Sequence, residues 1–251
     1  MLEAKNITIR FGGLTAVNNV SMQVRPGQIT ALIGPNGAGK TTLFNCISGV
    51  YVPNEGEVIL DGEHLEGKMG YKINAAGISR TYQVINLFWN MTVLENVLVG
   101  MHSRLTATFW DSLFHTKKKR EEEKQIVEKA NERLKFVGLD EHANDRAGSL
   151  SYGKQRLLEI VRGLASEPKV ILLDEPAAGM NTTEKAELDV LLQRILKMGY
   201  TILVVEHDMK LIMNISDYIY VLCQGSLLAE GTPAEIQNNP DVIAAYLGGD
   251  E

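Results

Sequence analysis

The sequence lacks long apolar runs and an excess of positive charge, and each absence excludes a class of protein. No run reaches the ~18 apolar residues that a membrane-spanning helix needs, although 45% of the 251 residues are hydrophobic, as in ordinary packed proteins. No apolar segment follows the start Met1–Lys5, so we expect no signal peptide. The formal net charge of −6 argues against general nucleic-acid binding.

Cysteine is also scarce. The chain has two cysteines, Cys46 and Cys223, which lie far apart in apolar stretches. We expect both to have packing roles in a reducing compartment. These shortages favour a cytoplasmic location and leave the chemistry open.

A glycine-rich segment carries the strongest functional signal. It fits the phosphate-binding pattern G-x-x-x-x-G-K-[ST] at each fixed position. The segment consists of Gly34, Pro35, Asn36, Gly37, Ala38, Gly39, Lys40, Thr41 and Thr42. Glycines allow successive backbone N–H groups to surround a phosphate chain, Lys40 supplies positive charge, and the Thr41 hydroxyl can bind Mg²⁺.

The neighbouring residues support this interpretation against a chance glycine-rich turn. The apolar run 29–33 predicts a buried strand, and residues 41–47 predict a helix. The N-terminus of that helix would face the phosphates.

A second apolar strand ends in two carboxylates, Asp174 and Glu175. The carboxyl edge of a parallel sheet is where α/β folds bind ligands. We expect Asp174 to reach Mg²⁺, directly or through water. Side chains alternate along a strand, so Glu175 points elsewhere and can orient or deprotonate the attacking water.

The distribution of periodic segments predicts an α/β core with a helical insertion at about 90–165. Strands are expected at 7–10, 20–24 and 56–62, and continuously apolar buried strands at 170–173 and 202–205. Helices are expected from about 92 and over 117–136. Another helix would carry an apolar stripe of Leu188, Leu191, Leu192, Ile195 and Met198.

The basic run 117–120 could bind an anionic surface. Glutamates 121–123 follow the three lysines at a spacing of four, however, so on a helix the two sets would pair and largely neutralise each other. We therefore favour a solvated helix face.

The segment Leu150–Gln155 could be a plain helix start capped by Ser151. It also resembles the signature motif of ATP-binding cassette (ABC) ATPases, usually Leu-Ser-Gly-Gly-Gln. Here Tyr152 replaces the first glycine, while Ser151 and Gly153 are kept. The resemblance implies that Ser151 and Gly153 bind the γ-phosphate of an ATP held by a partner subunit.

Further residues match the same family in order along the chain. The resemblance implies that Gln83 senses Mg²⁺ and links to a membrane partner, that His207 contacts the γ-phosphate, and that Lys40 and Glu175 act in catalysis with His207. Phe11 would stack on adenine, with Val17 beneath the base. Asn181 lies where most relatives carry aspartate, and with Glu184 it also fits a helix capping box.

The resemblance implies a P-loop NTPase fold with a mixed β core, an antiparallel β subdomain and a helical subdomain. The core and β subdomain would span about 1–90 and 166–251, and the helical subdomain about 91–165. The cofactors implied are ATP and Mg²⁺.

The segments 78–83, 91–97 and 150–155, with an extended segment at about 101–120, are similar to the LivG-type ATPases of branched-chain amino acid importers. This implies a second ATPase subunit, two transmembrane permease subunits and indirectly a solute-binding protein, at the cytoplasmic face of the membrane. Other possibilities are the ATPase of urea uptake or lipopolysaccharide export, a soluble ABC protein acting on DNA or ribosomes, and a small-molecule kinase. The last would need neither Ser151 nor His207.

Overall fold

The computed structural model describes residues 1–101 and 117–247 and divides into two compact units. The first comprises Met1–Gln83 and Lys169–Glu251, and the second Val84–Pro168. The predicted helical subdomain, about 91–165, begins seven residues later and ends three residues earlier than this second unit. None of the described helices is long and apolar enough to cross a lipid bilayer.

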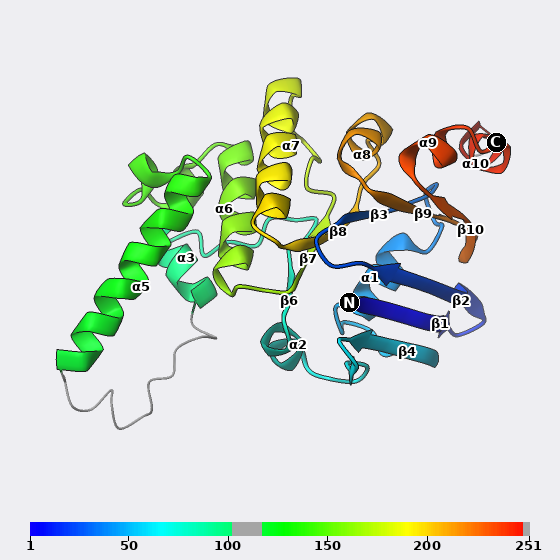
Figure 1. The fold of residues 1–251 in the computed structure, drawn as a ribbon, viewed down its shortest axis with the longest axis horizontal. Helices are drawn as coiled ribbons and strands as arrows, with labels where there is room; N and C mark the ends of the chain where they lie inside the picture. Colours follow the sequence, from blue (N-terminus) through cyan, green and yellow to red (C-terminus); the bar gives the residue numbers. More distant parts are fainter. Residues whose placement is uncertain (102–116, 248–251) are drawn as a thin grey trace. The chain divides into compact units, whose positions relative to one another are not determined.

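Two sheets form the framework of the first unit (Figure 1). The smaller sheet is antiparallel and has the order β2-β1-β4-β5. Its strands are β1 (Leu2–Phe11), β2 (Leu14–Val24), β4 (Glu55–Leu60) and β5 (Glu63–His64). The strands expected near 7–10, 20–24 and 56–62 are confirmed, and the first two extend further than predicted because their polar positions pair as well.

The larger sheet has the order β10-β9-β3-β8-β7-β6 and is parallel except at β10. Its strands are β3 (Ile29–Ile33), β6 (Ile78–Arg80), β7 (Val170–Asp174), β8 (Thr201–Val205), β9 (Tyr218–Cys223) and β10 (Ser226–Gly231). All residues of β3, β7 and β8 are buried, as continuously apolar parallel strands predict. The carboxyl ends of β3, β6, β7 and β8 therefore meet at one edge.

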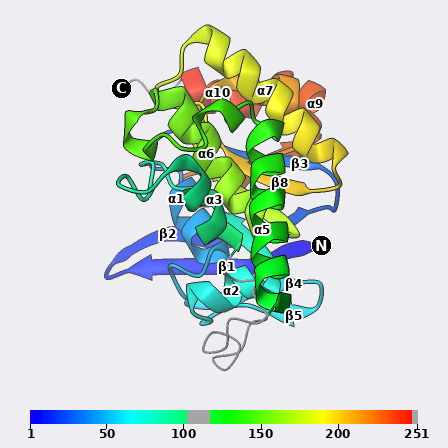
Figure 2. The same ribbon diagram turned by 90° about the vertical axis from the view of Figure 1, so that its left-hand side faces the viewer.

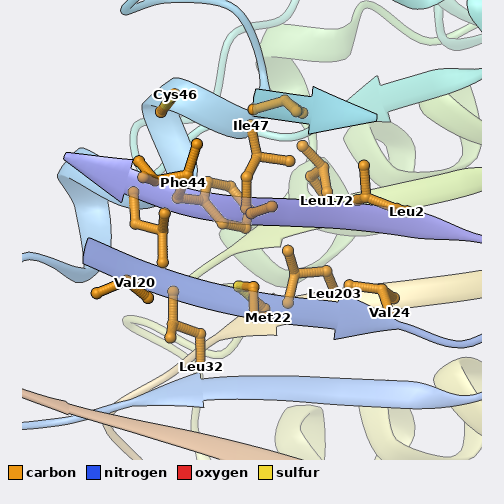
Figure 3. Packing of buried hydrophobic residues seen from close by; sticks show 14 of the residues in the cluster. Leu2, Val20, Met22, Val24, Leu32, Phe44, Cys46, Ile47, Leu172 and Leu203 are labelled. Carbon is orange, nitrogen blue, oxygen red and sulfur yellow. The ribbon is translucent and has the colours of Figure 1, made fainter. Parts of the chain in front are cut away.

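Helix α1 (Lys40–Ile47) lies between the two sheets, as both ribbon views show (Figures 1 and 2). One hydrophobic core fills the space around it. Phe44, Cys46 and Ile47 of α1 contribute to this core together with Leu32 and Leu203 of the larger sheet (Figure 3). Burial raises the pKa of the Cys46 thiol to about 12, in keeping with its expected packing role.

The remaining helices of the first unit complete its layers. They are α2 (Gly70–Ala76), α7 (Thr182–Lys197), α8 (Met209–Ile215), α9 (Pro233–Gln237) and α10 (Pro240–Leu247). Four of the five residues of the predicted apolar stripe on α7 are buried, but Met198 is 47% exposed. It differs because the helix ends at Lys197 and Met198 is its C-cap.

The second unit is helical. It contains α3 (Val93–Met101), α5 (Lys117–Phe136) and α6 (Tyr152–Ala165), with 3₁₀ turns at Asp140–His142 and Ala147–Ser149. Val93, Val97, Leu134, Leu158 and Val161 are part of its own hydrophobic core. The side chains of the basic run 117–120 and the segment 102–116 lie outside the described residues.

Candidate functional site

The glycine-rich loop joins β3 to α1 with a backbone that only glycine permits at two positions. Gly39 is the N-cap of α1 with φ +95°, and a Cβ there would lie 2.5 Å from the Ala16 carbonyl oxygen. At Gly34, with φ +149°, a Cβ would lie 2.1 Å from the Leu222 oxygen. The first-turn N–H groups of α1 have no partners within the helix, which makes this end suitable for an anion.

Lys40 lies inside this loop. Its Nζ donates hydrogen bonds to the Gly34 oxygen (2.7 Å) and the Pro35 oxygen (2.8 Å), and the residue is only 5% exposed. Burial lowers the pKa of the Lys40 amine, and the negative charge of Glu175 opposes that shift. The amine is thus held next to the backbone that would surround a phosphate chain.

Glu175 follows β7 and makes two contacts that bring distant segments together. His207 Nε2 lies 2.6 Å from Glu175 Oε1, and Gln83 Nε2 donates to Glu175 Oε2 at 3.0 Å. The backbone of Glu175 has φ +46°, a left-handed conformation that is rare for a residue with a side chain. Such conformations persist where the surrounding structure holds them, often at functional sites.

These residues share one cavity of about 670 Å³. It is lined by Phe11, Leu14, Thr15, Ala16, residues 36–42, Gln83, Glu175, His207, Gln224 and Gly225. Phe11 is 47% exposed and packs edge to face against Tyr51, with ring centroids 5.3 Å apart, so it is not a core residue. The cavity combines an aromatic face, a basic loop and a carboxylate.

Two residues expected at the site, Val17 and Asp174, do not line the cavity. Val17 is fully buried in the core, and its neighbours Thr15 and Ala16 line the cavity instead. Asp174 is buried beside the cavity, where Arg80 binds it. Ser151 and Gly153, which are predicted to bind the nucleotide of a partner subunit, lie in the second unit at the start of α6, and the Ser151 side chain makes no capping hydrogen bond.

Sequence reasoning missed three contributions. Glu206 is buried, and its carboxylate accepts hydrogen bonds from the N–H groups of Ala177 (2.6 Å) and His207 (3.0 Å), which fixes both loops. In the sequence, Glu206 could have been found as a charged residue directly after an apolar strand.

The turn at Gln224 and Gly225 also lines the cavity, and the Gly225 N–H donates to the Ala38 oxygen at 3.1 Å. The third is Arg80, considered below.

A second cavity, of about 540 Å³, adjoins the same loop. It is lined by residues 34–38, His207, Cys223, Gln224 and residues 244–246. Burial raises the pKa of the Tyr246 hydroxyl, and the nearby Gly34 backbone partly opposes this shift. Tyr246 therefore links α10 to the start of the glycine-rich loop.

A parallel sheet, a loop of this sequence and carboxylates at the same edge define a P-loop nucleotide-binding protein with the architecture of an ATP-binding cassette. A sequence model of the ABC transporter family matches residues 17–178, and the chain belongs to this family. It is therefore a nucleotide-binding ATPase of the ABC class. A second model, described as branched-chain amino acid ATP-binding cassette transporter, matches residues 226–251.

Curated and solved proteins agree with this assignment. The chain is 49% identical over 249 residues to the high-affinity branched-chain amino acid transport ATP-binding protein LivG of Escherichia coli K12, covering 99% of this chain and 98% of LivG. A crystal structure of an ABC transporter cassette in its ADP conformation matches with a TM-score of 0.85 and 33% identity, covering 99% and 98% of the two chains. A dimeric cassette bound to ADP and Pi matches with a TM-score of 0.77 and 26% identity, covering 93% of this chain and 99% of the other.

Proposed function

We propose that this chain is the ATP-hydrolysing subunit of an importer of branched-chain amino acids. One observation supports the hydrolytic role most directly: four residues from separate segments line one cavity. They are Lys40, Gln83, Glu175 and His207. The transported solute is supported by the similarity to LivG over nearly the whole chain.

The residues have separate roles in phosphoryl transfer to water. The N–H groups of the loop and the Lys40 charge hold the phosphates, and Phe11 stacks on the adenine. Glu175 accepts a proton from the attacking water, and His207 contacts the γ-phosphate while its bond to Glu175 orients that carboxylate. Catalysis consists mainly of positioning and charge stabilisation.

The oxygen donors near the loop fit a hard divalent cation. Thr41, with its hydroxyl, and Gln83, with its amide, line the cavity. The third donor is the carboxylate of Asp174, the last residue of β7. Mg²⁺ prefers such ligands and keeps part of its water shell. These three residues would hold it, and the ion would neutralise charge on the β- and γ-phosphates.

The partners follow from the same family. Ser151 and Gly153 at the start of α6 would bind the nucleotide of a second ATPase subunit, since the N-terminus of a helix favours an anion. The dimer would act on two permease subunits at the cytoplasmic face of the membrane, which receive solute from a binding protein. No nucleic acid takes part.

Hydrolysis is tested with Lys40→Ala, which removes the charge on the phosphates. We expect weaker ATP binding and loss of turnover, measured as nucleotide affinity beside phosphate release. The exposed Glu187→Gln serves as the control and should behave like the parent. Normal turnover by Lys40→Ala would refute the assignment of the site.

The solute is tested by transport. The chain, its cognate permeases and the solute-binding protein are reconstituted in liposomes, and uptake of labelled leucine, valine and isoleucine is compared with uptake of urea. We expect ATP-dependent uptake of the branched-chain amino acids. Uptake of urea alone, or ATPase activity that no permease stimulates, would favour the other transporters or a soluble ABC protein.

A further inference from the structure

Arg80 occupies an unusual place beside the proposed Mg²⁺ ligand. It is the last residue of β6, and its side chain is 10% exposed. Nη2 donates to Asp174 Oδ2 at 2.8 Å, while Nη1 donates to Asn45 Oδ1 at 2.7 Å and to Ser48 Oγ at 2.5 Å. One guanidinium group thus joins the carboxylate at the end of β7 to α1 and its C-cap.

Two aromatic rings fix the plane of this group. The guanidinium carbon lies 4.9 Å from the centre of the Phe44 ring and 5.1 Å from that of Tyr82. Phe44 is fully buried in the core, so its ring gives the guanidinium a fixed surface to stack on. A planar group with several donors is needed to satisfy both rings and three oxygens, and a lysine ammonium lacks that shape.

The backbone around Arg80 connects it to two other parts of the site. The Thr81 N–H donates to the Leu172 oxygen at 2.9 Å, and the Asp174 N–H donates to Thr81 Oγ1 at 3.3 Å. Gln83, which binds Glu175, follows two residues later. Any displacement of Asp174 is therefore resisted by both strands β6 and β7.

We propose that Arg80 is a positioning residue that holds the Asp174 carboxylate in one orientation for Mg²⁺. The guanidinium engages Oδ2, and no residue that the structure describes donates to Oδ1. The inference rests on the proposed role of Asp174 as a metal ligand. Partners of metal ligands typically alter metal affinity by about 10-fold or more when removed, because the ligand loses its orientation.

The test measures how much Mg²⁺ strengthens nucleotide binding. The affinity for a fluorescent ATP analogue is determined with Mg²⁺ and with EDTA for the parent, Arg80→Gln and Arg25→Gln. Arg25 is a matched control, an exposed arginine stacked on Tyr218 at 5.7 Å. We expect the Mg²⁺-dependent gain to fall about 10-fold in Arg80→Gln, with unchanged affinity in EDTA and an unchanged gain in Arg25→Gln.

Arg80→Lys separates charge from geometry. Because lysine cannot make the same set of contacts, we expect Arg80→Lys to lose most of the Mg²⁺-dependent gain that Arg80→Gln loses. If Arg80→Gln does not fold, the double variant Asn45→Ala with Ser48→Ala removes two anchors and leaves the arginine. This double variant should show a smaller reduction of the gain. An undiminished gain in folded Arg80→Gln, or in the folded double variant where Arg80→Gln does not fold, would overturn the proposal.

Asp174→Asn separates the role of Asp174 as a metal ligand from the role of Arg80 in positioning it. If Asp174→Asn keeps the full Mg²⁺-dependent gain, the role of Asp174 itself is refuted. If Asp174→Asn loses the gain while Arg80→Gln keeps it, only the positioning role of Arg80 is refuted. A lower unfolding temperature in Arg80→Gln with an unchanged gain would mark Arg80 as structural alone.

Discussion

At the scale of single residues, Glu175 is the centre of the site. Its two carboxylate oxygens contact different partners, His207 and Gln83, and its backbone is held in a left-handed conformation. A side chain fixed at both oxygens loses little freedom when a substrate binds. This arrangement suits a group that must meet an attacking water in one geometry.

Glu175→Gln should bind nucleotide normally and lose turnover by at least about 100-fold, because an amide cannot accept the proton of the water. Single-turnover hydrolysis and equilibrium binding measure the two properties separately. Glu187→Gln on α7 is the exposed control. Hydrolysis at the parental rate by Glu175→Gln would remove Glu175 from the catalytic role.

Phe11 offers a separate test of the proposed adenine site. Phe11→Ala should lose about 1 kcal/mol of nucleotide affinity, a typical aromatic contribution, while Phe11→Tyr should be nearly neutral. Isothermal titration at matched Mg²⁺ concentration measures both. Equal affinities for all three proteins, with unchanged unfolding, would show that the base binds elsewhere.

The sequence predicted the residues whose chemistry is local and missed those that depend on the order of the sheet. The phosphate loop and the Asn181–Glu184 capping box lie within a few consecutive residues, and the capping box has both hydrogen bonds. The contacts of Arg80 and Glu206 require β6, β7 and β8 to be neighbours, which no local pattern reveals. Val17 was misplaced because its side chain points into the core between the sheets.

At the scale of elements, the helices beside the site are fixed at their first turns. Asp208 caps α8 by accepting a hydrogen bond from the Leu211 N–H, and it also pairs with Lys185 of α7 at 2.7 Å. His207 directly precedes this cap. The charged pair therefore ties α7 to the loop that carries His207.

The pair predicts a pH dependence of stability. Hydrogen bonding from Lys185 lowers the pKa of Asp208, and the same bond raises the pKa of Lys185. A lowered carboxyl pKa stabilises the fold above the unfolded pKa, and this contribution disappears as the pH falls through the folded pKa. The raised lysine pKa acts at the alkaline end, where its contribution disappears as the pH rises through the folded value.

Asp208→Asn keeps the capping oxygen and removes the charge. It should therefore unfold at a lower urea concentration than the parent at neutral pH, with a difference that vanishes in acid. Urea titrations from pH 7 down to pH 2 measure this difference, with the exposed Asp241→Asn as control. A difference that stays constant down to pH 2 would contradict the electrostatic account.

At the scale of the whole molecule, the two compact units carry different parts of the proposed machinery. The first unit carries the phosphate loop, Glu175 and His207, and the second carries Ser151 at the start of α6. A composite site built from two chains would need both units of each subunit. The solved dimeric relative bound to ADP and Pi supports a dimer as the form to test.

In a Glu175→Gln background, ATP without Mg²⁺ should stabilise a dimer, because the nucleotide binds and is not hydrolysed. Adding Ser151→Arg should abolish this dimer, since a bulky cation would fill the space meant for a hydroxyl. Light scattering with and without ATP gives the mass. An ATP-dependent dimer that tolerates Ser151→Arg would refute the composite site.

The position of β3 in the larger sheet has a consequence for the synthesis of this chain. β3 lies between β8 and β9, yet it leaves the ribosome about 170 residues before β8 and about 190 residues before β9. Until then the strand Ile29–Ile33, in which only Thr30 is polar, has neither neighbour. Because long-range parallel pairing forms slowly and exposed strand edges aggregate, the nascent chain should depend on chaperones until translation is nearly complete.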